Sequence, residues 1–187
     1  MARMEELEFW AHKPGAFKAF MDFCGTIWGE GLIEYRLREI VRYRAGTLVK
    51  CEHCTNMRIA EAREEGLTEE LLQKAMRYEW GELSEREKTA LMYAELLITT
   101  PGDITDSLYA EVKRLFSDAE IAELTLWILS TNFHQRLLAA LQVRAPAAVK
   151  EDEVYLMRFK RFGQVSPEHA STTSGRFKIE TLKRAEL

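Results

Sequence analysis

The sequence contains few of the residues that end helices or cross-link a chain. Its 187 residues include only four prolines, ten glycines and three cysteines. This scarcity of turn-forming residues favours a few long helices over many short strands. No apolar run reaches the roughly 18 residues that a membrane span needs, and the first residues lack the basic-then-apolar order of a signal peptide. We therefore expect a cytoplasmic protein with no membrane partner.

The net charge is also small. It is −4, with 26 Lys and Arg against 30 Asp and Glu, which is too mild for a protein that binds nucleic acid. Hydrophobic residues make up 47% of the chain and charged residues 30%, as in an ordinary globular protein. A chain of this length can bury a substantial core without disulfide cross-links. A close pair of cysteines in the cytoplasm then indicates metal binding or redox chemistry.

Helical periodicity dominates the first 149 residues. Two capping boxes, Ser84 with Glu87 and Ser117 with Glu120, predict the starts of helices. One apolar stripe repeats at steps of three and four residues, formed by Ile33, Leu37, Ile40, Val41, Ala45 and Leu48. No strand pattern of comparable strength precedes residue 150. The sequence predicts an all-α fold, a compact bundle of about seven to eight helices over residues 1–149.

Residues 150–187 differ from this helical domain. The stretch 165–175 has the composition of a loop, yet its flanks are apolar, with Val154, Tyr155, Phe159 and Phe177 among their members. Exposing all of these side chains to water would be costly. We expect a C-terminal arm that packs on the body or on a neighbouring subunit of a homo-oligomer. A partly disordered arm is the alternative.

The motif that carries chemistry is Cys51-Glu52-His53-Cys54. Two cysteines at positions i and i+3 of a helix are neighbours, close to disulfide distance. We expect the preceding helix to end near Gly46, which would place both cysteines in the first turns of the next helix. Backbone N–H groups at a helix start favour the thiolate, the reactive form of cysteine. The pair can therefore cycle between dithiol and disulfide.

Glu39 and His53 are the candidate proton-transfer groups. If the chain reverses near Gly46, Glu39 lies roughly opposite Cys54 and can act as a general base. His53 can shuttle a proton or pair with the thiolate as an imidazolium. Half of a zinc site is the alternative, but a fourth ligand is missing because the sequence has no second Cys-x-x-Cys.

A series of motifs in order resembles the carboxymuconolactone decarboxylase-like superfamily, and within it the alkyl hydroperoxidase D (AhpD) branch. Besides Cys51-Glu52-His53-Cys54, the likeness is carried by residues 37–41, 60–70, 83–87, 94–95, 101–106, 116–121, 132–133 and 136–137. It covers about residues 14–145 and leaves out the arm. The resemblance implies an all-α fold and oligomers built from repeated helix pairs.

The resemblance also implies residue roles. The second cysteine of the pair is the more reactive one in the peroxidase branch, so Cys54 would be the nucleophile and Cys51 the resolving thiol. The family's glutamate falls on Glu39, and a histidine found between the cysteines in some members falls on His53. The sequence departs from the pattern at Arg58, where the peroxidases have a histidine. A guanidinium stays protonated, so it cannot relay protons near neutral pH.

For Arg58 itself two placements are open. It can stand near Cys54 and lower the pKa of that thiol by its charge, or it can point to solvent or pair with Glu61.

Together these residues predict a peroxidase or a related thiol oxidoreductase. Cys54 would attack a peroxide and become a sulfenic acid, and Cys51 would then close the disulfide. A dithiol on a lipoyl-bearing or thioredoxin-like protein would restore the pair by exchange. This chemistry needs no cofactor and no metal. The alternatives are a lactone decarboxylase, which requires no cysteine pair, and a non-enzymatic redox-sensing or interaction module.

Overall fold

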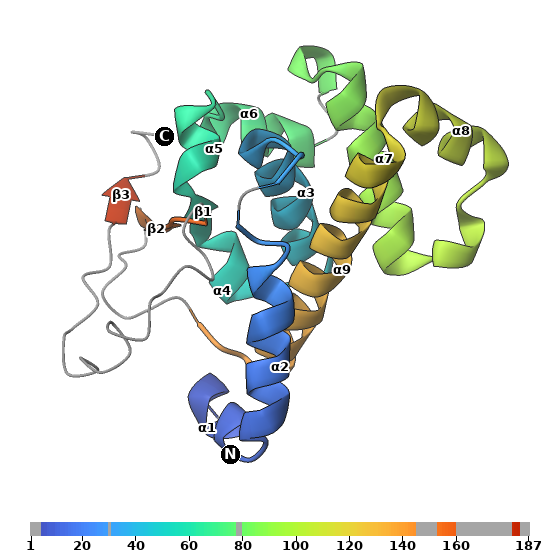
Figure 1. Cartoon of the computed structure of the whole chain (residues 1–187). Helices are drawn as coiled ribbons and strands as arrows, with labels where there is room; N and C mark the ends of the chain where they lie inside the picture. The colour runs from blue at the N-terminus through green and yellow to red at the C-terminus, as the bar shows by residue number, and fades with distance from the viewer. Residues whose placement is uncertain (1–4, 30, 78–79, 145–152, 160–180, 184–187) are drawn as a thin grey trace.

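The structure, a computed structural model of the chain, describes residues 5–29, 31–77, 80–144, 153–159 and 181–183 (Figure 1). These residues form nine α-helices, two of them a single turn or little more. The helices are α1 (Glu6–Ala11), α2 (Pro14–Gly25), α3 (Tyr35–Leu48), α4 (Glu52–Thr55), α5 (Ala60–Glu64), α6 (Glu69–Met76), α7 (Glu85–Thr99), α8 (Asp106–Leu115) and α9 (Asp118–Leu141). The predicted all-α fold is confirmed. None of the described helices is both long and apolar enough to cross a membrane.

The helix starts follow the local sequence. The side chain of Ser84 accepts a hydrogen bond from the Glu87 amide, and the Glu87 carboxylate accepts one from the Ser84 amide. Ser117 and Glu120 make the same reciprocal pair at the start of α9. Both predicted capping boxes are therefore confirmed, and each satisfies N–H groups that a helix start leaves without a partner.

The core lies where α3 packs against α7 and α9 (Figure 1). Ile40 and Val41 of α3, Leu91 of α7, and Leu124 and Trp127 of α9 are fully buried. Burying one such aliphatic side chain stabilises the fold by roughly 1.5–3 kcal/mol. This packing makes α3 a rigid support for the segment that follows it.

A small sheet, which the sequence did not predict, closes one side of the molecule (Figure 1). Its strands are β1 (Met57–Ile59), β2 (Glu153–Met157) and β3 (Thr181–Lys183), in the order β1-β2-β3. β1 pairs in parallel with β2, and β2 pairs antiparallel with β3. A strand of three residues is too short to show an alternating pattern, and the partner of β1 lies about a hundred positions further along the chain.

The described part of the C-terminal arm packs on the body. Val154, Tyr155 and Phe159 are buried, and Phe159 contacts the rings of Trp28 and Trp127 at centroid distances of 5.8 and 5.6 Å. These residues of the arm therefore pack on the body, which was one of the two packing partners expected from the sequence. Phe177 and the loop-like stretch 165–175 lie outside the described residues.

Candidate functional site

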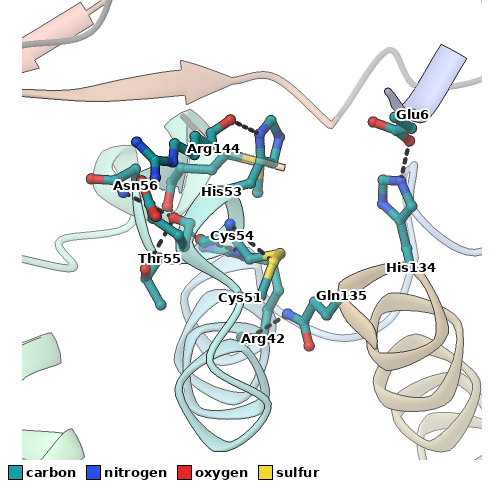
Figure 2. Close-up of a disulfide and its surroundings, with 12 residues drawn as sticks. Glu6, Arg42, Cys51, His53, Cys54, Thr55, Asn56, His134, Gln135 and Arg144 are labelled. Carbon is teal, nitrogen blue, oxygen red and sulfur yellow. Dashed lines mark hydrogen bonds and ion pairs between the residues drawn. A yellow bond between two sulfur atoms is a disulfide. The ribbon is translucent and has the colours of Figure 1, made fainter. Parts of the chain in front are cut away.

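The cysteine pair lies at the start of α4, directly after α3. Lys50 turns the chain with a positive φ of 56°, and Cys51 is the N-cap residue of α4, whose sulfur accepts a hydrogen bond of 3.3 Å from the Cys54 amide. The two cysteines form a disulfide with a Cα–Cα distance of 5.3 Å (Figure 2). The expected placement in one short helix is confirmed, although α3 ends at Leu48 rather than near Gly46.

Gly46 allows α3 and α4 to approach closely at this point. A Cβ atom at Gly46 would lie 3.3 Å from Cβ of Cys54 and 3.5 Å from Nε2 of Gln135. The backbone of α3, the second cysteine and α9 therefore meet at one small residue. A larger side chain there would have to displace either the disulfide or Gln135.

The two cysteines differ in their access to one cavity, whose described lining residues include Cys54 but not Cys51. Cys54 borders a cavity of about 260 Å³. Cys51 is fully buried, in a cluster with Cys54 and Leu138. A small molecule that enters the cavity thus meets Cys54, with Cys51 behind it.

The cavity wall is mainly apolar and includes several aromatic rings. Trp10 of α1, Phe17 and Phe20 of α2, Trp28 and Phe159 line it. The rings support one another, since Trp10 stacks on Phe20 with centroids 5.6 Å apart. Such a wall favours ligands with an apolar body.

His53 is held by a hydrogen bond at each ring nitrogen. Nδ1 lies 3.1 Å from the carbonyl oxygen of Arg144, and Nε2 lies 2.6 Å from the hydroxyl of Tyr155 (Figure 2 shows the first contact). A carbonyl only accepts, so the neutral ring carries its proton on Nδ1 and accepts from Tyr155 at Nε2. Burial lowers the pKa of His53 and outweighs the opposing effects of the Arg144 carbonyl and of Glu6.

Glu39 is buried on α3 and is bound by Arg42. Both carboxylate oxygens accept hydrogen bonds from Arg42, at 2.6 and 2.8 Å, and the side chain of Glu39 is only 1% exposed. Arg42 in turn donates to the carbonyl oxygens of Cys54 and Met57, each at 2.9 Å. Arg42 lines the cavity beside Cys54, whereas Glu39 is not among the described lining residues. A buried carboxylate needs a paired charge, so the link from Glu39 to Cys54 passes through Arg42.

Arg58 is fixed on β1 by a network of its own. It binds both oxygens of Glu69 at 2.8 Å, donates to the carbonyls of Thr55 and Met57, and lies over the ring of Tyr43 at 4.5 Å. Of the two placements considered for Arg58, exposure to solvent or pairing with Glu61 is wrong, because Arg58 is buried in a strand and α6 supplies its partner Glu69. Arg58 is not among the described residues that line the cavity.

A second histidine and a carboxylate also line the cavity. Nε2 of His134, on α9, lies 2.6 Å from a carboxylate oxygen of Glu6, on α1 (Figure 2). Burial raises the pKa of Glu6, but the hydrogen bond and charge of His134, with the charge of His53, outweigh it and lower that pKa overall.

Sequence reasoning missed several of these side chains. Arg42 carried a signal, since a charged residue within the apolar stretch of a buried helix needs a partner. Tyr155, Glu6 and His134 carried none, because their partners lie far away in the sequence. Gln135 donates to the carbonyl of Arg42 at 2.8 Å, and its buried Oε1 accepts no hydrogen bond from the described residues.

Cys24 is separate from the site. It is a free, fully buried thiol within α2, and burial raises its pKa to about 12. Among the described residues, no three His, Cys, Asp or Glu side chains are grouped so that they could hold a metal ion.

Comparison with known proteins identifies the class of fold. A protein of unknown function from Agrobacterium tumefaciens superposes with a TM-score of 0.67 at 23% identity, over 79% of this chain and 99% of that one. An uncharacterized peroxidase-related protein from Ralstonia eutropha, with an alkylhydroperoxidase AhpD core, superposes with a TM-score of 0.62 at 15% identity, over 84% and 80%. The chain therefore has the AhpD-like fold.

The sequence comparison agrees. Residues 14–96 match the model of the Carboxymuconolactone decarboxylase family, so the resemblance to that superfamily is confirmed over these residues. The likeness to AhpD is a likeness of fold. The uncharacterized protein Rv2313c of Mycobacterium tuberculosis is 33% identical over 118 residues, which is 63% of this chain. The matched region spans 41% of the length of that relative.

Proposed function

We propose that the chain is a thiol peroxidase that reduces organic hydroperoxides at Cys54 and stores the oxidation as the Cys51–Cys54 disulfide. One observation carries the proposal. Cys54 lines an apolar cavity of about 260 Å³, and Cys51 stands behind it at disulfide distance. A nucleophilic sulfur that faces a substrate cavity, with a resolving sulfur behind it, is the arrangement such chemistry requires.

The cavity favours a hydroperoxide with an apolar substituent over hydrogen peroxide. Its volume exceeds the roughly 150 Å³ that holds a benzene molecule, and the rings of Trp10, Phe20 and Trp28 line it. Near Cys54 the wall becomes polar. Oε1 of Gln135 accepts no hydrogen bond from the part of the chain that the structure describes, so it is free to accept one from the substrate hydroxyl.

The reaction balances with one hydroperoxide and one external dithiol. The Cys54 thiolate attacks the terminal oxygen, the O–O bond breaks, and the alkoxide leaves and takes up a proton to become an alcohol. The sulfenic acid at Cys54 then reacts with the Cys51 thiol, which forms the disulfide and releases water. A lipoyl-bearing or thioredoxin-like dithiol protein restores both thiols and is itself oxidised.

Arg42 and Glu39 are proposed to support Cys54 rather than to act as its base. The guanidinium of Arg42 binds the Cys54 carbonyl, and a positive charge near a thiol favours the thiolate. Glu39 holds Arg42 in place through two hydrogen bonds. His53, held at both ring nitrogens by the Arg144 carbonyl and the Tyr155 hydroxyl, is proposed to hold the cysteine segment in place rather than to carry a proton.

The test is a thiol titration of the reduced protein before and after one equivalent of cumene hydroperoxide, with mass spectrometry to locate the disulfide. The wild type should lose two thiols and gain the Cys51–Cys54 bond. Cys51→Ser should stop at a sulfenic acid, and Cys54→Ser should not react. Cys24 serves as an internal control because it should keep its thiol. No loss of thiols in the wild type would refute the proposal.

A steady-state assay separates the peroxidase from the other candidates. Continuous turnover with dihydrolipoamide or reduced thioredoxin supports an enzyme, whereas a single stoichiometric oxidation supports a redox sensor. The lactone decarboxylase alternative makes no use of a cysteine pair at the cavity, so Cys54→Ser would leave it intact. Homo-oligomerisation stays a prediction, which light scattering tests, and the cytoplasmic location stays one too.

A further inference from the structure

Reduction of a hydroperoxide requires a proton for the leaving alkoxide, and the obvious donors near Cys54 are committed elsewhere. Arg58, at the position where the resemblance expects a histidine, is bound to Glu69 and two carbonyls. A guanidinium does not release its proton near neutral pH. His53 is engaged at both nitrogens, by the Arg144 carbonyl and the Tyr155 hydroxyl.

The cavity holds one further pair that can move a proton. His134 lines it from α9 and Glu6 from α1, and His134 Nε2 contacts a Glu6 carboxylate oxygen at 2.6 Å. The ring of His134 packs against Phe20 and Trp28, with centroid distances of 5.9 and 6.0 Å. Figure 2 shows the pair apart from the cysteine pair, on the α9 side of the site.

The geometry defines what each member can do. A carboxylate at Nε2 fixes the orientation of an imidazole and leaves Nδ1 as its second proton site. When protonated, His134 can donate one proton to Glu6 and the other to a ligand in the cavity. The remaining ionisable side chains of the cavity wall, apart from Cys54, are Arg42 and His53.

We propose that His134 is the general acid of the peroxidase reaction and that Glu6 is its positioning residue. Resting on the function proposed above, the inference adds one step. As Cys54 sulfur bonds to the terminal oxygen, the O–O electron pair passes to the proximal oxygen, and Nδ1 of His134 transfers its proton there to give the alcohol. Solvent then reprotonates His134.

The experiment compares two oxidants in single-turnover reactions of the reduced protein at pH 7. The leaving group of cumene hydroperoxide is an alkoxide, which needs a proton. The leaving group of peracetic acid is acetate, which does not. His134→Gln should slow thiol loss with cumene hydroperoxide by about 100-fold, the lower range of general acid catalysis. The rate with peracetic acid should stay within about twofold. Glu6→Gln should also slow the reaction with cumene hydroperoxide and spare the reaction with peracetic acid, but by a smaller factor.

Two control variants match these changes. His12→Gln alters an exposed histidine next to α1, and Asp22→Asn removes the carboxylate of an exposed ion pair with Lys18 on α2. Both should react like the wild type with either oxidant.

Several outcomes decide the matter. If His134→Gln slows the reaction equally with both oxidants, or slows it with neither, the role of His134 is overturned and the proposed function stands. A wild type that reacts with peracetic acid but not with cumene hydroperoxide refutes the proposed function, and the general acid falls with it. A wild type in which neither oxidant consumes the thiols refutes the proposed function, and the general acid falls with it. If His134→Gln does not fold, Glu6→Gln allows the same comparison of the two oxidants, because Glu6 lies near the surface on a short helix.

Discussion

The hydroxyl of Tyr155 lies 2.6 Å from Nε2 of His53, although the two residues are 102 positions apart. Tyr155 stands on β2, and β2 is placed by its parallel pairing with β1, which directly follows the cysteine segment. Burial raises the pKa of Tyr155, so its hydroxyl stays protonated and is the donor. The C-terminal arm therefore supplies one of the two groups that hold the histidine between the cysteines.

Removing this hydroxyl tests the contact directly. Tyr155→Phe keeps the buried ring and should lower the free energy of unfolding by about 0.5–1.5 kcal/mol, the usual contribution of one hydrogen bond. Urea unfolding measures the change. Tyr109→Phe is the control, because Tyr109 is an exposed residue of α8 and its hydroxyl should be dispensable. An unchanged midpoint for Tyr155→Phe would mean that the hydrogen bond contributes nothing.

The pH dependence of stability should carry a contribution from His53. Its pKa in the folded protein lies below the usual 6.5 because of burial, so the unfolded chain binds the proton more readily. The fold should therefore lose stability as the pH falls below about 6.5, and above that value His53 should contribute no pH dependence. His53→Gln should flatten the curve in this window. Unfolding midpoints measured between pH 8 and pH 5 check it, and parallel curves would contradict the expectation.

Glu6 should affect the pH dependence of stability in a separate, more acidic pH range. Its pKa lies below the usual 4.5, through the hydrogen bond and charge of His134. A lowered carboxyl pKa stabilises the fold above the unfolded value, and this contribution is lost as the pH falls through the folded value. Glu6→Gln should therefore lower stability at pH 6 but not at the acid end. Asp22→Asn, at an exposed position, is the control and should leave both ends unchanged.

Breaking the Glu39–Arg42 pair should be costly. Glu39→Gln leaves the guanidinium of Arg42 buried without its counter-charge, and loss of one partner of such a pair destabilises by about 3–5 kcal/mol. Denaturant unfolding measures it. The matched control is Glu111→Gln, which breaks the exposed pair with Arg114 and should not move the midpoint. A small effect at Glu39 would show that Arg42 finds another partner.

Restoring the histidine of the family pattern should not improve this protein. Arg58→His loses two hydrogen bonds to Glu69 and two to backbone carbonyls. Hydrogen bonds to charged groups contribute about 1.5–3 kcal/mol each, so a loss of at least ~2 kcal/mol is expected, with no gain in hydroperoxide turnover. Chemical unfolding and a turnover assay check the two parts. Higher turnover at unchanged stability would place a proton relay at position 58.

The sequence by itself determined the helices and the reactive pair. Ser84 and Ser117 start their helices through contacts with residues three positions away, and Cys51 and Cys54 reach each other within one turn. Such features depend on neighbours in the chain, so a pattern in the sequence is enough to predict them.

Tertiary structure decided everything that surrounds the pair. Cys54 faces a cavity because α1, α2 and α9 supply the side chains that line it. The partner of His53 comes from β2, and the partner of His134 comes from α1. Arg42, one turn from Glu39, intervenes between that carboxylate and Cys54 because both charges are buried together. Contacts between residues about a hundred positions apart leave no periodic signal in the sequence, and only the folded chain brings them within hydrogen-bond distance.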